Sequence, residues 1–257
     1  MIGRTQRHRP GIQTQVTIHH VGLLVGASLL LGGAAMADTV ELAFMGVDHT
    51  YTAKGTYPGG SYYAYVGISN LDVEGWGAFK SFCVDLYDNA GDLGKYNKYE
   101  LKPLSEAPQS VGNLNTRMGE AGVLAIAKLW DLYYDAALAN LKTAAALQVA
   151  IWEVVNEKGA VNQDGRFSLA GGSFTATGGN FDKAQAQKML NSILDYNPTH
   201  QLPRLFAFVN TTDATHYQDF IGVPDGGVTL ALLGISLGAL AFLARRKSSV
   251  GRAGQRQ

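Results

Sequence analysis

The chain has 257 residues, of which 21 are Lys or Arg and 21 are Asp or Glu, so its formal net charge is zero. The basic residues concentrate at the two ends, which leaves residues 38–222 with a net charge of −7. This balance excludes the basic surface that nucleic-acid binding needs, and we expect no nucleic-acid partner. Because there is one cysteine, a disulfide bond within the chain is excluded.

Residues 1–37 have the three parts of a secretory signal peptide. A region with three arginines and no acid precedes an apolar stretch at 21–33, and the small-x-small cleavage pattern AMA follows. A membrane-spanning helix is the alternative interpretation, but the apolar stretch is short for one. We predict cleavage that leaves a mature protein beginning near Asp38.

The segment from Asp38 to about Ser81 is predicted to form β-strands. It is rich in Gly, Tyr, Thr and Val, and residues 62–68 alternate in character as a strand requires. The stretch YPGGS at 57–61 has the Pro and Gly residues of a turn between two strands.

Cys83 stands in the segment KSFCVDLYD, in which polar and apolar residues alternate as in a strand. A free cysteine often packs as a small buried hydrophobic residue, and a disulfide bond between two chains is a further alternative. His49, His200 and His216 would be available to a cysteine hydrolase, but no signature of such an enzyme surrounds the thiol.

Two helices are predicted, over 119–141 and about 143–156, because apolar residues recur there at helical spacing. In the second, the stretch LQVAIWEVV places Gln148 within or beside the apolar face. An unpaired amide buried there would cost roughly 1–3 kcal/mol, so the side chain needs a partner. A hydrogen bond to nearby backbone is the ordinary solution.

The remaining elements complete an α+β pattern. We predict a hairpin turn at 162–166 with a strand on either side, a third helix over 181–196, and closing strands at 205–209 and 217–221. Strands, then helices, then strands favour the α+β class. We expect one domain over residues 38–222, with a mixed β-sheet or sandwich part and a helical insertion.

Two short motifs resemble the internal-thioester domains of bacterial surface adhesins. In that family a Cys in a [YF]-C-[IV]-D context is joined to the Gln of a T-Q-x-A-I-W motif. FCVD at 82–85 matches the first motif, and QVAIW at 148–152 matches the second, with Leu147 in place of Thr. The resemblance implies a Cys83–Gln148 thioester, formed when the thiolate attacks the side-chain carbonyl and ammonia leaves. The loop it closes would add roughly 4 kcal/mol of stability.

A thioester is also a stored electrophile. An amine on another molecule, such as a lysine, can expel the thiolate and leave a permanent amide link. Because water must be kept out meanwhile, we expect Phe82 and Trp152 to shield the bond. Asp85, predicted on the same strand face as Cys83, would orient donors around the carbonyl. Core packing for Trp152 and a surface or turn-capping role for Asp85 are the alternatives.

Residues 228–244 form a second apolar run, whose 17 residues are at the lower limit for a transmembrane helix. Arg245, Arg246 and Lys247 follow directly, as a stop-transfer signal does, and begin a basic tail, 245–257, that we expect to stay in the cytoplasm. A buried terminal helix is the alternative, but the run has no polar stripe.

The motif Val223-Pro224-Asp225-Gly226-Gly227 stands immediately before this run. Motif, apolar helix and basic tail in this order resemble the PEP-CTERM class of bacterial sorting signals, and the Gly-Gly ending is closest to VPDSG-like variants. Pro and Gly keep such a motif extended, as a protease requires. The resemblance implies an exosortase-like membrane protease as partner, transient anchoring in the inner membrane, and a final location at the cell surface, in the outer envelope or outside the cell.

Other chemistry has little support in the sequence. Asp85, Asp88, Asn89 and Asp92 could bind calcium, but no D-x-D-x-D-G loop is present. The chain also lacks phosphate-loop, dinucleotide-binding, zinc-protease and paired-cysteine motifs. We therefore expect no metal, no cofactor and no enzymatic turnover.

The sequence thus predicts an exported, surface-directed protein that attaches once, through its thioester, to an amine on a matrix, a cell surface or a neighbouring protein. The alternative is a non-reactive structural component of an extracellular matrix or biofilm with the same fold.

Overall fold

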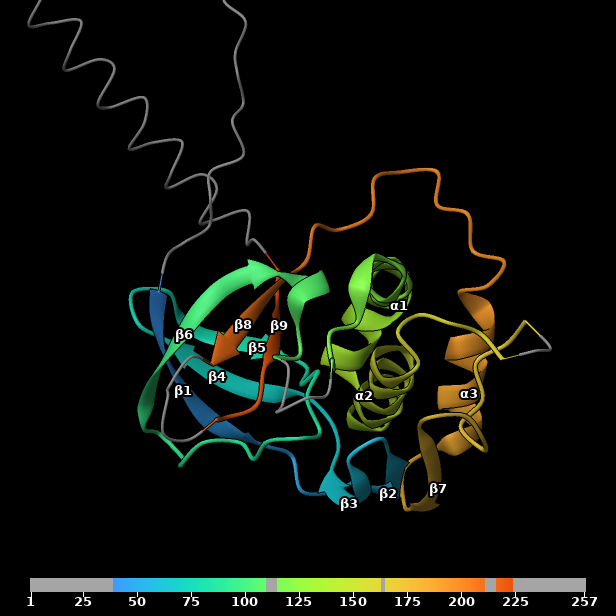
Figure 1. The fold of residues 1–257 in the computed structure, drawn as a ribbon. Helices are drawn as coiled ribbons and strands as arrows, with labels where there is room; N and C mark the ends of the chain where they lie inside the picture. Colours follow the sequence, from blue (N-terminus) through green and yellow to red (C-terminus); the bar gives the residue numbers. More distant parts are fainter. Residues whose placement is uncertain (1–38, 110–114, 163–164, 211–215, 224–257) are drawn as a thin grey trace, which may run out of the picture. The chain divides into compact units, whose positions relative to one another are not determined.

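The computed structural model describes most of the predicted domain (Figure 1). The described residues are 39–109, 115–162, 165–210 and 216–223. The predicted signal peptide, motif residues 224–227, the transmembrane helix and the basic tail lie outside them. No described helix combines the length and the apolar character that a bilayer span requires.

Six strands form one antiparallel sheet in the order β5-β4-β1-β6-β8-β9. Their bounds are β1 (Thr39–Val47), β4 (Ser69–Val73), β5 (Gly77–Ser81), β6 (Tyr96–Pro103), β8 (Phe206–Asn210) and β9 (Phe220–Gly222). In β4, buried Leu71 and Val73 alternate with exposed Asn70, as expected of a strand with one face on the core. All five residues of β8 are buried, so this strand is covered on both faces.

The two edges of this sheet are linked at Cys83. The chain leaves β5 and continues to Cys83, which forms an isolated antiparallel bridge with Phe220 of β9. The N–H of Ile221 donates to the carbonyl of Phe82 at 3.0 Å, and the N–H of Val84 donates to the carbonyl of Asp219 at 3.0 Å. The backbone on either side of the cysteine is therefore fixed by β9.

A smaller antiparallel sheet has the order β3-β2-β7, with β2 at Thr52–Tyr57, β3 at Gly60–Tyr65 and β7 at Thr175–Gly179. The predicted turn at 57–61 connects β2 to β3. Gly55 of β2 lies so close to β7 that an added Cβ would be 1.8 Å from the carbonyl oxygen of Thr175. Only glycine fits there.

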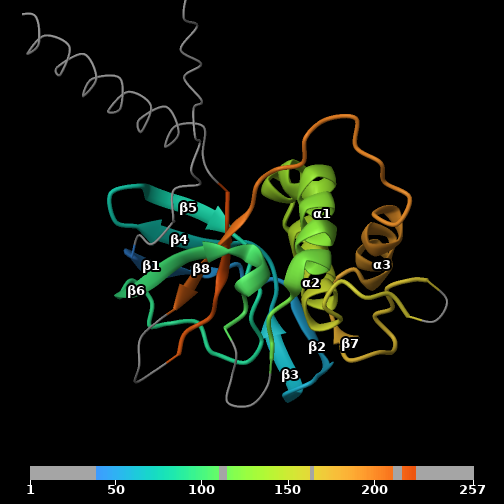
Figure 2. The ribbon, with the colours of Figure 1, turned by 45° about the horizontal axis from the view of Figure 1, so that its top comes forward.

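Three α-helices pack together beside the six-stranded sheet, and α2 lies between α1 and α3 (Figures 1 and 2). Their bounds are α1 (Gly119–Ala139), α2 (Leu141–Asn156) and α3 (Lys183–Ser192); a short 3-10 helix, η1 (Leu104–Glu106), precedes them. Asn140 separates α1 from α2, and its side chain caps α2 by accepting the N–H of Thr143 at 3.0 Å. Twelve of the 16 residues of α2 are buried, so its polar side chains need partners inside the protein.

The α+β class is confirmed, and α1 and α2 follow β6 as the expected helical insertion. The strands predicted on either side of 162–166 are wrong, because the described residues there form turns and irregular structure. The side chain of Asn162 accepts the N–H of Arg166 at 2.9 Å, and the N–H of Ser168 bonds to Glu153 of α2 at 2.7 Å. These local bonds use the donors that a strand ladder would need.

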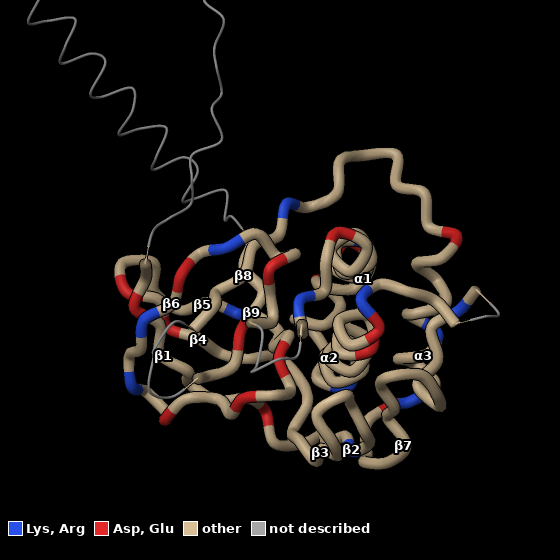
Figure 3. Tube along the Cα trace, viewed as in Figure 1, with Lys and Arg blue, Asp and Glu red and all other residues tan. Residues whose placement is uncertain are grey.

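The third helix is shorter than predicted. It begins after Asp182, whose carboxylate accepts the N–H of Gln185 at 2.9 Å and caps the helix, and it ends at Ser192. Figure 3 shows Lys and Arg interspersed with Asp and Glu over the described elements, without a basic cluster on any one of them.

Candidate functional site: Cys83 and Gln148

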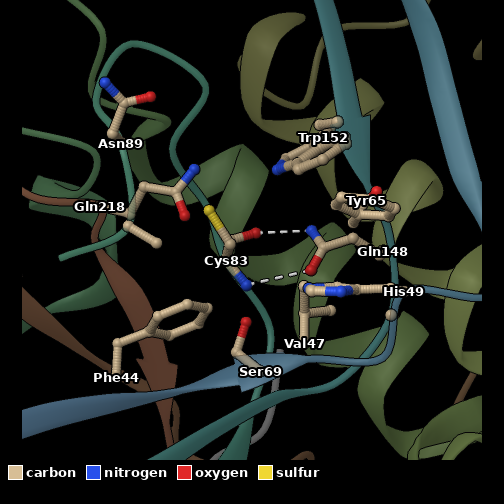
Figure 4. Close-up of a pocket in the computed structure, with 13 residues that line it drawn as sticks. Phe44, Val47, His49, Tyr65, Ser69, Cys83, Asn89, Gln148, Trp152 and Gln218 are labelled. Atoms are coloured by element: carbon tan, nitrogen blue, oxygen red, sulfur yellow. Dashed lines mark hydrogen bonds between the residues drawn. The ribbon is translucent and has the colours of Figure 1, made fainter. Parts of the chain in front are cut away.

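The structure brings Cys83 and Gln148 together across 65 positions of sequence. Gln148 Oε1 accepts the backbone N–H of Cys83 at 3.1 Å, and Gln148 Nε2 donates to the backbone carbonyl of Cys83 at 2.7 Å (Figure 4). Gln148 is 2% exposed and Cys83 is 4% exposed. The carboxamide therefore pairs with the cysteine backbone as a neighbouring strand would, which satisfies an amide in the middle of the most buried helix.

The sulfur of Cys83 points toward Asp85. Cys83 is a free thiol, and its Sγ donates to the carbonyl of Asp85 at 2.8 Å and accepts the N–H of Asp85 at 3.2 Å. The carboxamide of Gln148 lies on the other side of the cysteine (Figure 4). In this arrangement the sulfur must turn about the Cα–Cβ bond to reach the carbonyl carbon.

The surroundings keep this thiol protonated. Burial raises the pKa of Cys83 well above its ordinary value, and the nearby carboxyls of Asp85 and Asp219 raise it further. Hydrogen bonding from the backbone of Asp85 and from the side chain of Trp152 acts in the opposite direction. A negative charge on the sulfur is thus costly here unless donors compensate it.

Two buried acids lie close to the site. Burial and the neighbouring Asp219 raise the pKa of Asp85 well above its ordinary value. Asp219 accepts the N–H of Asn210 at 2.9 Å and the N–H of Gln109 at 2.7 Å, yet burial raises its pKa to about 7. The two acids are not both ionised below neutral pH, which limits the negative charge next to the thiol.

The predicted position of Asp85 on the strand face of Cys83 is wrong. Strand β5 ends at Ser81, and after the bridge at Cys83 the chain turns, so that the Asp85 carboxylate accepts the N–H of Tyr87 at 2.7 Å. This is the turn-capping alternative. Asp85 contacts the sulfur through its backbone instead of orienting donors around the Gln148 carbonyl.

The two predicted shielding residues lie in different places. Trp152 follows Gln148 by one helical turn and borders the same cavity as the thiol. Phe82 is buried against α1, with its ring centroid 5.9 Å from that of Trp130 and 6.4 Å from that of Tyr134. Phe82 therefore packs on the helix side, and its part in covering a thioester stays a prediction.

A cavity of about 290 Å³ adjoins the cysteine and the carboxamide. Besides these two residues it is lined by Trp152, His49 and Tyr65, with further residues from 44–47, 64–69, 89–90 and Gln218. His49 and Tyr65 are exposed and stack with ring centroids 4.3 Å apart, so they form its mouth. No lysine or arginine is among the described residues that line it.

Sequence reasoning did not single out Tyr65 or the buried acids Glu153 and Asp219, and it considered His49 only for a hydrolase. Glu153 had a signal, since it is an acid inside the apolar run of α2. For the calcium alternative, the described residues contain no group of three or more His, Cys, Asp or Glu side chains that could hold a metal ion.

Comparison with known proteins identifies the C-terminal segment. Residues 222–248 match the family model of the VPDSG-CTERM motif, which confirms the predicted PEP-CTERM-like sorting signal. A comparison with curated proteins found no match. Among solved structures, the chain is similar to the N-terminal thioester domain of fibronectin-binding protein SfbI from Streptococcus pyogenes, with 14% identity, a TM-score of 0.38, and coverage of 74% of this chain and 94% of that one.

The sorting motif supports an exported, cell-surface protein and implies processing by an exosortase-like membrane enzyme. The matched segment begins at Gly222, the last residue of β9, and Val223, the first residue of the motif, is the last residue that the structure describes.

Proposed function

We propose that this exported protein forms a thioester between Cys83 and Gln148 and uses it once, without turnover, to attach to an amine on a partner surface or matrix. The pair of hydrogen bonds between the Gln148 carboxamide and the Cys83 backbone, at 3.1 and 2.7 Å, carries this proposal. They hold the one cysteine and the carboxamide in contact at a place where both residues are almost fully buried.

Bond formation needs no external reagent. The sulfur attacks the side-chain carbon of Gln148, the C–S bond forms, the C–N bond breaks, and the thiol proton leaves with the amide nitrogen as ammonia. The Cys83 N–H already donates to Gln148 Oε1, so it is in place to stabilise the charge that grows on this oxygen during the attack.

In the attachment step, an amine of the partner takes the place on the Gln148 side chain that ammonia left. A primary amine attacks the same carbon, the C–N bond forms, the C–S bond breaks, and the sulfur receives the proton that the amine loses. The cavity next to Gln148 gives a lysine side chain a route to the bond, and none of the described residues that line it is a lysine or arginine that would repel an ammonium group.

The sorting segment supports a role at the cell surface. An exosortase-like enzyme would act on the motif that begins at Val223, while the helix predicted at 228–244 anchors the chain in the inner membrane for a time. Processing would then place the domain at the cell surface, in the outer envelope or outside the cell, where it can meet its partner.

The second candidate is a structural component of an extracellular matrix or biofilm without a reactive bond. One observation favours it: both polar atoms of Gln148 are satisfied by backbone, and the sulfur bonds to Asp85 instead of facing the carbonyl. A glutamine that only braces the core would have these contacts.

Intact mass of the purified protein separates the two candidates. Thioester formation removes one ammonia, about 17 Da, and Cys83→Ala must abolish this loss because the nucleophile is gone. Methylamine must then add to Gln148 and release a titratable thiol. An unreduced mass together with a thiol that reacts without prior amine treatment would establish the structural role instead.

A further inference from the structure

The indole N–H of Trp152 is buried without a well-formed hydrogen bond. Trp152 is 2% exposed, and its Nε1 makes no hydrogen bond of normal geometry. The nitrogen faces the sulfur of Cys83 across the edge of the cavity (Figure 4). The contact is looser than a normal hydrogen bond, but it is among the influences that lower the pKa of the thiol.

A buried donor without a partner costs free energy, so its presence next to a reactive group calls for an explanation. Shielding alone does not supply one, since the exclusion of water requires apolar surface and not a buried N–H. The other N–H near the sulfur, that of Asp85, already bonds to it at 3.2 Å. Because burial and two carboxyls oppose charge on this sulfur, one backbone donor is weak compensation.

We propose that Trp152 is a catalytic residue of the thioester chemistry: its indole N–H donates to the Cys83 sulfur when that sulfur carries negative charge. This inference depends on the proposed function. When the thioester forms, the sulfur attacks Gln148 as it loses its proton, and the N–H stabilises the developing thiolate. When an amine opens the bond, the electron pair of the C–S bond moves to sulfur, and the same N–H stabilises the leaving thiolate until it takes the amine's proton.

The donor role and the shielding role predict opposite results for Trp152→Phe. Loss of a shield lets water and amines in, so the thioester would open faster. Loss of a donor to the leaving sulfur slows opening by methylamine roughly tenfold or more, as expected for a hydrogen bond to a charged group.

The experiment measures the rate at which methylamine opens the thioester in the purified protein, followed by intact mass. Trp152→Phe is compared with Trp152→His, which keeps a ring N–H and is expected to restore part of the rate. Trp130→Phe is the matched control, because it removes the indole of a buried tryptophan that packs on Phe82, away from the cavity. It is expected to leave the opening rate unchanged.

A second readout does not need the thioester. In the Gln148→Ala background, where no bond can form, Trp152→Phe is expected to raise the pKa of the Cys83 thiol, measured by thiolate absorbance against pH. An unchanged thiol pKa, or faster opening by methylamine, overturns the donor role while the proposed function stands. Absence of the 17 Da loss in the protein without substitutions overturns the proposed function. If Trp152→Phe still raised the thiol pKa in that case, Trp152 would stabilise a Cys83 thiolate but would have no part in thioester chemistry.

Discussion

Helix α2 has two buried polar side chains, Gln148 and Glu153, which differ in how fully they are hydrogen-bonded. Gln148 has both its oxygen and its nitrogen bonded to the backbone of a single residue, Cys83. Glu153 is 1% exposed; its Oε1 accepts the N–H of Ser168 at 2.7 Å, while its Oε2 is buried with no hydrogen-bond partner.

The two residues therefore differ in how their contribution to stability depends on pH: that of Gln148 is constant, and that of Glu153 changes. An amide does not titrate, so its contacts with Cys83 persist at any pH at which the fold does. Burial raises the pKa of Glu153 to about 8, and the charge of Glu157 adds to the effect, so the carboxyl is largely protonated at neutral pH. Three experiments test this contrast, and a fourth tests the cavity beside Gln148.

The largest effect is expected from opening the loop between Cys83 and Gln148. If the thioester is present, treatment with methylamine should lower the free energy of unfolding by roughly 4 kcal/mol, because the cross-link no longer restricts the unfolded chain. Urea denaturation before and after treatment measures it. Cys83→Ala has no bond to open, so the amine should leave its stability unchanged, and a matching loss in this variant would show a nonspecific effect.

The next largest effect is expected when the Gln148 amide is removed from a variant that already lacks the Cys83 thiol. In the Cys83→Ala background, Gln148→Leu leaves the N–H and C=O of residue 83 buried without partners, and we expect a loss of roughly 3 kcal/mol. The matched control is Gln187→Leu, since Gln187 bridges the N–H of Leu169 and the C=O of Phe167 in the same way at a half-buried position. Water can replace that bridge, so Gln187→Leu is expected to cost less of the free energy of unfolding. Equal costs for the two variants would show that burial does not set the effect at Gln148.

A smaller, pH-dependent effect is expected at Glu153. The folded protein binds the proton of this carboxyl more tightly than the unfolded chain, so its contribution to stability is complete below pH 4.5 and falls as the pH rises toward 8. Glu153→Gln removes this dependence and should gain roughly 2 kcal/mol relative to the native protein between pH 6 and pH 8. Thermal or urea unfolding at both pH values measures it, and a difference that does not change with pH would refute a buried, protonated Glu153.

The smallest effect on stability is expected at the mouth of the cavity. Tyr65 is 47% exposed, so Tyr65→Ala should change the free energy of unfolding by no more than about 0.5 kcal/mol. The wider mouth should speed attachment of a lysine-containing peptide more than that of methylamine, which is small enough to enter already. Tyr63→Ala, on the same strand but not lining the cavity, should leave the ratio of the two rates unchanged.

Much of the fold and the central contact could be predicted because short stretches of sequence encode them. Helical spacing located α1 and α2, and the motifs around Cys83 and Gln148 predicted that these residues meet. The setting of Asp85 could not be predicted, because it depends on β5 ending at Ser81 and on the link to β9, which comes from the far end of the domain. The mouth formed by His49 and Tyr65 depends on two different segments that only the fold brings together.

The short strand β9 has a mechanical consequence. It is three residues long, it connects β8 to the backbone beside Cys83, and it is the last described element before the sorting segment. Under the proposed function, and while the C-terminal segment still holds the protein to its cell and Gln148 holds it to a partner, tension would reach the few hydrogen bonds of β9 before it reached the helices. Under load, the strand that fixes the cysteine backbone is therefore expected to detach first, so pulling would expose the cysteine while the link to the partner endures.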